Sequence, residues 1–103
     1  MKQQEKAIHI EWDLNEKERF KEIIKTIKKR SDTLANKIKE IVKYNLALIQ
    51  QNPKIFEADS LKPNNDGSFR KFQAIQIRIV YKIERNKIII VRVRHALTEP
   101  KEY

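Results

Sequence analysis

The spacing of apolar residues predicts one short strand followed by two helices. Residues 7–13 alternate apolar and polar side chains, a pattern typical of a strand. In residues 15–30 the apolar positions recur at the spacing of one helix face, and residues 33–51 repeat this pattern. Ser31 interrupts the pattern and offers a helix cap, whereas Pro53 ends the second helix. Because the break between the helices is short, we expect an antiparallel helix hairpin.

The second half of the chain predicts a polar loop and then three strands. Residues 53–68 hold the turn-forming residues, and the strands are expected at 69–74, 75–84 and 87–95. This order predicts an α+β fold with an N-terminal strand, a helix hairpin and a three-stranded antiparallel meander. Both helices should pack on one face of a single sheet. At this length, residues 1–103 are expected to form one domain.

The pairing of the last two strands can be predicted from burial. A two-residue turn would place Arg92 beside Ile79, on the face that must be buried. A three-residue loop, 84–86, would instead pair Ile79 with Val91 and Arg78 with Arg92, and we predict this register because a one-residue slip exchanges the two faces. The residues predicted to be buried are Ile77, Ile79, Tyr81, Val91 and Val93. The residues predicted to be exposed are Arg78, Lys82, Arg92 and Arg94.

The charge of the chain indicates a polyanionic or acidic partner. There are 23 Lys and Arg residues against 14 Asp and Glu, a formal net charge of +9. The charge is concentrated in residues 70–95, where Glu84 is the only acidic residue. No apolar run approaches the ~18 residues of a membrane span, and the N-terminus shows no signal stretch. We therefore expect a cytoplasmic protein with no membrane partner.

Several classes of chemistry are excluded by composition. The absence of cysteine excludes a disulfide scaffold, a thiolate metal site and thiol catalysis. Gly67 is the only glycine, which excludes glycine loops that cradle phosphate. His9 and His95 lie far apart and have no metal-ligand spacing. We predict no metal and no cofactor.

Four strings of residues, taken in order, resemble a known toxin superfamily. They are Ile10-Glu11-Trp12, Phe69-Arg70-Lys71-Phe72, the string from Ile77 to Ile83, and the string from Ile88 to His95. Together they resemble the RelE/ParE superfamily of bacterial toxins. The resemblance implies the toxin of a type II toxin–antitoxin, plasmid-stabilisation-type system, held in a hetero-oligomer with its cognate antitoxin.

The superfamily contains two activities, and both remain open at this point. One branch cleaves messenger RNA in the ribosomal A site without a metal, as an RNA-binding endoribonuclease or mRNA interferase. The other branch inhibits DNA gyrase and cuts nothing. Our first expectation is ribosome-dependent RNA cleavage, with gyrase inhibition as the alternative. A non-toxic nucleic-acid-binding module of the same fold is the second alternative.

The resemblance to the RNA-cleaving branch assigns candidate catalytic residues. Metal-free cleavage needs a base, an acid and cations beside the phosphate. Arg78 matches a phosphate-binding arginine, Lys71 a catalytic lysine and Tyr103 a C-terminal catalytic tyrosine, while His95 ends the last strand near the expected site. Phe69 stands where that branch has a second lysine, so the acid–base set is reduced. The residues expected to bind nucleic acid are Arg70, Lys82, Arg92 and Arg94.

Overall fold

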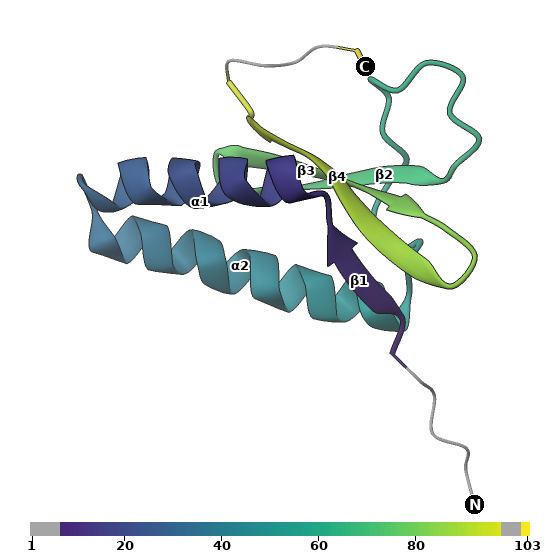
Figure 1. Ribbon diagram of the computed structural model, residues 1–103, viewed down its shortest axis with the longest axis horizontal. Coiled ribbons are helices and arrows are strands. Elements are labelled where there is room, and N and C mark those ends of the chain that lie inside the picture. Colours follow the sequence, from purple (N-terminus) through teal and green to yellow (C-terminus); the bar gives the residue numbers. More distant parts are fainter. Residues whose placement is uncertain (1–6, 98–101) are drawn as a thin grey trace, which may run out of the picture.

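The computed structural model describes residues 7–97 and 102–103 and confirms the predicted α+β fold. Figure 1 shows the two helices lying side by side next to the sheet. The elements, in chain order, are β1 (His9–Trp12), α1 (Leu14–Lys28), α2 (Asp32–Gln51), β2 (Phe69–Ala74), β3 (Ile77–Ile83) and β4 (Lys87–His95).

Each helix begins at a polar side chain that caps it. The Asp13 carboxylate accepts hydrogen bonds from the main-chain N–H groups of Asn15 at 3.0 Å and Glu16 at 3.2 Å. The predicted cap at Ser31 is confirmed, because its hydroxyl oxygen accepts from the N–H of Leu34 at 3.0 Å. These caps satisfy amides that have no partner within the helix, which fixes where each helix starts.

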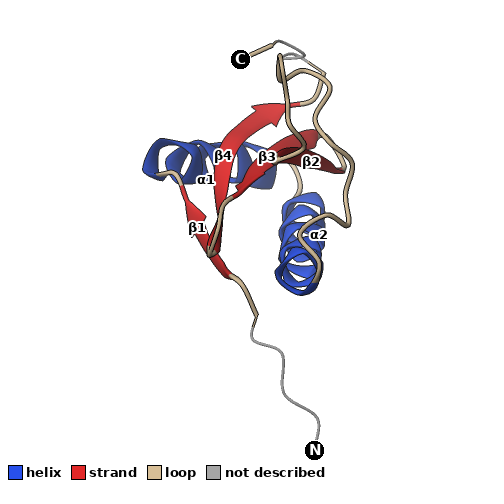
Figure 2. Ribbon diagram, turned by 90° about the vertical axis from the view of Figure 1, so that its right-hand side faces the viewer, coloured by secondary structure: helices blue, strands red, loops and turns tan. Residues whose placement is uncertain are grey.

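The four strands form one mixed sheet in the order β1-β4-β3-β2. β1 pairs with β4 in parallel, whereas β2, β3 and β4 form the predicted antiparallel meander. The helices cover one face of this sheet, with α1 against β4 and α2 against β1 and β2; Figure 2 distinguishes the two layers by colour. The largest fully buried core side chains are Ile38, Ile49, Ile77, Ile79, Tyr81, Ile88, Ile90 and Val93.

The predicted register between β3 and β4 was wrong, but the observed register still keeps apolar side chains of β4 on the buried face. The turn has two residues, because the Glu84 N–H donates to the Lys87 carbonyl at 2.9 Å. Tyr81 lies opposite Ile90, the register then shifts, and Val80 lies opposite Arg92, which leaves Val91 as an extra residue. This bulge, and not an odd loop, changes the parity of β4. Ile88 and Ile90 therefore face the core before it and Val93 faces the core after it.

The bulge also changes the predicted partners and burial. Ile79 pairs with Val93 and Arg78 pairs with Arg94, two residues beyond the predicted partners. Val91, predicted to be buried, is half-buried. The four basic residues predicted to be exposed are not: Arg78 is buried, and the other three, Lys82, Arg92 and Arg94, are half-buried.

The strand predicted at 75–84 corresponds to β3, which begins two residues later than predicted. Ile75 forms part of the turn between β2 and β3, where it adopts a left-handed φ of 58° and is 41% exposed. Alternation had placed this side chain on the buried face. A two-residue hairpin turn, here Ile75 and Gln76, favours left-handed backbone because its twist matches that of the strands, and at Ile75 a β-branched residue adopts it despite its steric cost.

Candidate functional site

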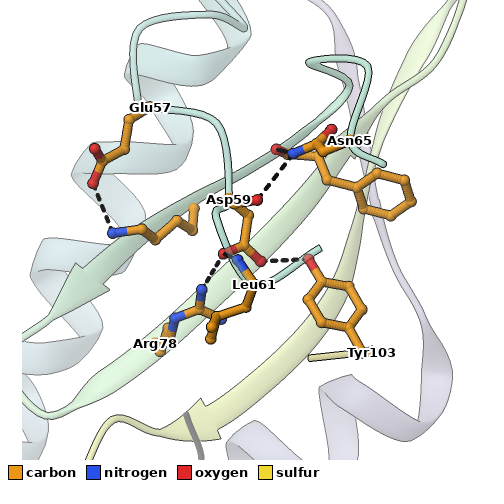
Figure 3. Close-up of polar contacts among 8 residues, drawn as sticks. Glu57, Asp59, Leu61, Asn65, Arg78 and Tyr103 are labelled. Atoms are coloured by element: carbon orange, nitrogen blue, oxygen red, sulfur yellow. Dashed lines mark hydrogen bonds and ion pairs between the residues drawn. The ribbon is translucent and has the colours of Figure 1, made fainter. Parts of the chain in front are cut away.

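The candidate site lies on the outer face of the sheet, which we define as the face away from the helices. Arg78 points to this face because it alternates with Ile77 and Ile79, which belong to the core beneath the helices. Arg78 is nevertheless only 8% exposed. The segment between α2 and β2, together with Tyr103, covers it (Figure 3).

This segment follows the free edge of β2. The Asp59 N–H donates to the Phe69 carbonyl at 2.9 Å, and the Lys71 N–H donates to the Glu57 carbonyl at 3.2 Å. Asn65 braces the return of the loop, since its side-chain NH₂ donates to the carbonyls of Asp59 at 3.1 Å and Phe69 at 2.8 Å. The predicted polar loop is therefore tied to the sheet, and it presents Asp59 to the outer face.

Asp59 is the centre of a buried polar group that we call the Asp59 cluster, formed by Asp59, Arg78 and Tyr103. One carboxylate oxygen accepts hydrogen bonds from Arg78 Nη2 and from the Leu61 N–H, the latter at 3.1 Å. The other accepts from the Tyr103 hydroxyl at 2.5 Å (Figure 3). Asp59 is 1% exposed, so the ion pair with Arg78 is removed from water. The charge of Arg78 is thus neutralised within the protein.

Tyr103 is held on the outer face by two basic side chains. Lys62 Nζ lies 5.0 Å from the centre of its ring and donates to its main-chain carbonyl at 3.3 Å. The Arg92 guanidinium lies 4.5 Å from the centre of the same ring, a cation–π distance. Burial raises the pKa of the Tyr103 hydroxyl, and the hydrogen bond to the Asp59 carboxylate raises it further. Tyr103 therefore acts here as a hydrogen-bond donor.

The four candidate catalytic residues are not gathered at one place, because His95 lies on the opposite face of the sheet from the other three. Arg78 and Tyr103 are brought together on Asp59, whereas Lys71 Nζ lies 2.7 Å from a Glu57 carboxylate oxygen. This hydrogen bond lowers the pKa of Glu57. His95 lies beneath the helices, where it lines a groove of about 320 Å³ with residues of both helices. The sheet therefore separates His95 from Arg78.

The residues expected to bind nucleic acid are engaged in contacts within the protein. Arg70 donates to the carbonyls of Gly67 and Phe56, both at 2.9 Å, and so braces the loop. Lys82 lies 3.3 Å from a Glu84 carboxylate oxygen. Arg92 lies over Tyr103, and Arg94 donates to a carboxylate oxygen of Glu16 at 2.8 Å.

Sequence reasoning missed Asp59 and Glu16, both buried acids. Asp59 stands in a polar loop, and nothing in its local pattern distinguishes it from an exposed turn residue. Glu16 resembles an ordinary acid in the first turn of a helix, where it suits the helix dipole. In the structure its carboxylate also accepts from the Val93 N–H at 2.8 Å, just past the end of β1. The carboxylate thereby supplies a hydrogen-bond acceptor for an N–H group at the edge of β4 that β1 is too short to reach.

In residues 7–97 and 102–103, no group of three or more His, Asp or Glu side chains is placed to hold a metal ion. No helix in the same part of the chain is long and apolar enough to cross a membrane.

The fold and the residues on it define a class of protein. A helix hairpin on one face of a small mixed sheet, with basic residues along its C-terminal strands, is consistent with the fold that the resemblance to the RelE/ParE superfamily toxins implies. The family model for the ParE toxin of the type II toxin-antitoxin system, parDE, matches residues 10–100. The chain belongs to this family, and its partner is a cognate antitoxin. No curated protein matches it in a sequence comparison.

The two tyrosines with raised pKa values predict a loss of stability at alkaline pH. Burial raises the pKa of Tyr81 to about 12, and that of Tyr103 is also raised. Each hydroxyl stays protonated in the folded state while it ionises in the unfolded state near its ordinary pKa of about 10. Their contribution is therefore complete below about pH 10 and is lost as the pH rises towards the folded-state values.

Urea denaturation between pH 8 and pH 11.5 measures this loss. Tyr103→Phe is expected to be less stable than the parent at pH 8 and to lose less stability as the pH rises, because the ionising group is gone. Tyr44→Phe, a change on a ring that is exposed, is the matched control and should follow the parent. Parallel pH profiles for Tyr103→Phe and the parent would contradict the placement of Tyr103 on Asp59.

Proposed function

We propose that this toxin arrests growth by binding DNA gyrase and that it does not cleave RNA. Its membership of the ParE toxin family supports this target. The observation that carries the proposal is the separation of the candidate catalytic groups: Arg78 and Tyr103 are bound to Asp59, and His95 lies under the helices on the other face of the sheet. Ribosome-dependent cleavage, our first expectation from sequence, is thereby disfavoured.

Metal-free RNA cleavage has requirements that this arrangement does not meet. A base must take the 2′-hydroxyl proton, an acid must protonate the leaving oxygen, and cations must stabilise the phosphate. The charge of Arg78 is already cancelled by the buried carboxylate of Asp59. Freeing Arg78 for a phosphate would leave a buried carboxylate unpaired, which costs about 3–5 kcal/mol. A protein that acts by binding needs no such rearrangement.

The antitoxin is the second part of the proposal. We expect it to neutralise the toxin in a hetero-oligomer, with acidic side chains against the basic residues of the toxin and apolar side chains supplying most of the affinity. Leu97, which is 83% exposed two residues beyond the end of β4, offers one apolar contact.

A supercoiling assay tests the target directly. The purified toxin is incubated with DNA gyrase, ATP and relaxed plasmid, and we expect supercoiling to stop at near-stoichiometric toxin and to recover when antitoxin is added. In parallel, toxin is expressed in cells and messenger 5′ ends are mapped. Growth arrest with DNA-damage signalling and intact messengers is the expected result.

The variant His95→Gln separates the two activities. Loss of a general acid or base lowers a cleavage rate by about 10²–10⁴-fold. A gyrase inhibitor has no such dependence, so His95→Gln should arrest growth as the parent does. Discrete in-frame cuts in messengers that disappear in His95→Gln, with gyrase unaffected, would overturn the proposal. Absence of any arrest would favour a non-toxic nucleic-acid-binding module.

A further inference from the structure

The solvent-exposed side of α1 carries a row of four lysines, which are not part of the Asp59 cluster. Lys17, Lys21, Lys25 and Lys28 follow one another at intervals of about one helical turn and lie on one side of the helix. All four are exposed. At 1.5 Å per residue the row extends over about 16 Å.

Three of these lysines, Lys21, Lys25 and Lys28, border a groove between the two helices. The groove measures about 330 Å³ and is lined by Phe20, Lys21, Ile24, Lys25, Lys28 and Lys39. We call it the lysine groove. It contains four basic side chains and no acidic one, and residues of the sheet take no part in it.

The charge of the lysine groove is not neutralised by the protein. Among the described residues, Lys25, Lys28 and Lys39 form no ion pair. Lys21 lies 3.6 Å from a Glu18 carboxylate oxygen, but both side chains are more than 60% exposed, and such pairs contribute little. Like charges one helical turn apart are destabilising, and the helix dipole compensates only those in the last turn. Stability alone therefore does not account for this arrangement.

The floor of the groove indicates which kind of ligand it suits. Ile24 is 8% exposed, and the ring of Phe20 packs against Trp12 with 5.4 Å between ring centres. These apolar side chains already belong to the core, so they offer little surface on which a peptide could anchor. What the groove offers is a line of compact positive charges, and a linear polyanion with regularly spaced phosphates matches that line.

We propose that the lysine groove binds the phosphate backbone of duplex DNA. This proposal rests on the proposed inhibition of gyrase. Because gyrase acts on DNA, a toxin bound to gyrase would contact both the enzyme and its DNA. The groove is built from the helices alone, while the Asp59 cluster lies on the outer face of the sheet. DNA and a protein partner can therefore occupy different surfaces.

Fluorescence anisotropy with a labelled 20-base-pair DNA duplex tests the proposal without gyrase. The groove variant is Lys21→Gln/Lys25→Gln/Lys28→Gln. The control variant is Lys37→Gln/Lys54→Gln/Arg85→Gln, which removes the same charge from exposed residues outside the groove. All proteins are titrated between 50 and 200 mM salt, and circular dichroism verifies that each variant is folded.

The expected result has two parts. The groove variant should bind DNA at least about tenfold more weakly at 50 mM salt, and the slope of log affinity against log salt should fall by about 2–3, because each phosphate contact contributes about 0.9 to it. The control variant should lose less than about threefold and keep its slope to within about one unit. A duplex RNA of the same length should bind no more tightly than the DNA.

Three outcomes would overturn the proposal. Equal weakening of both variants would mean that net charge alone attracts DNA. Tighter binding of the RNA duplex would assign the groove to RNA. A groove variant that binds DNA normally but loses its antitoxin would assign the groove to an acidic protein. The anisotropy assay contains no gyrase, so the two proposals can fail separately. DNA binding without gyrase inhibition would overturn only the proposed function. Gyrase inhibition without DNA binding would overturn only this inference.

Discussion

Replacing Asp59 by alanine is expected to lower the free energy of unfolding by about 3–5 kcal/mol, because it leaves the buried Arg78 guanidinium without its counter-charge. The hydroxyl of Tyr103 and the N–H of Leu61 lose their acceptor in the same step. In a protein of this size the change removes a large part of the total stability. Urea denaturation of purified toxin measures it.

The double variant Asp59→Leu/Arg78→Met is the control for this prediction. Removing both charges together avoids an unpaired buried ion, so it should recover much of the stability that Asp59→Ala loses. A matched surface change, Asp66→Ala, alters another acid of the same loop that is exposed. A loss below about 1 kcal/mol for Asp59→Ala would show that Arg78 is solvated and that the loop does not cover it.

The second large effect is expected at Glu16. Glu16→Ala should cost about 3 kcal/mol, because the Val93 N–H and the Arg94 guanidinium each lose a charged acceptor at 2.8 Å. Thermal and urea unfolding of the variant measure this. Glu16→Gln keeps an acceptor oxygen without the charge and should cost about 1 kcal/mol.

Glu18 provides the comparison within the same helix. Its side chain is 70% exposed and contacts only Lys21 at 3.6 Å, so Glu18→Ala should change stability by less than about 0.5 kcal/mol. If Glu16→Ala and Glu18→Ala were equally mild, Glu16 would be only a first-turn acid, and the exposed edge of β4 would be satisfied by water.

The features that sequence predicted correctly depend on residues close together in the chain. Helix spacing over about two turns, a cap at Ser31 and a stop at Pro53 are local, so the hairpin of α1 and α2 follows from them. Alternation likewise predicted the three C-terminal strands. It also placed Arg78 on the face of the sheet opposite to the core residues Ile77 and Ile79, which is where the structure has it. The strings along β1 to β4 were sufficient to identify the superfamily, which the family model confirms.

The features that sequence could not predict depend on contacts between distant segments. Four consecutive apolar residues, from Ile88 to Val91, fit either face of a strand, and only packing against the helices and β3 places the bulge at Val91. Because β1 is short, the acid that serves the edge of β4 comes from α1.

Whether Arg78 is exposed or buried also depends on contacts between segments that are distant in the chain. Alternation identifies the face of the sheet to which a side chain points, but it does not reveal whether another segment covers that face. Asp59 contacts Arg78 from a loop, and Tyr103 joins them from the C-terminal end of the chain. No local sequence pattern predicts these contacts. The sequence by itself thus determined the elements, the family and the face on which the basic residues lie. The tertiary structure decided that Arg78 is neutralised, because burying a charge requires a partner and the fold supplies one in Asp59.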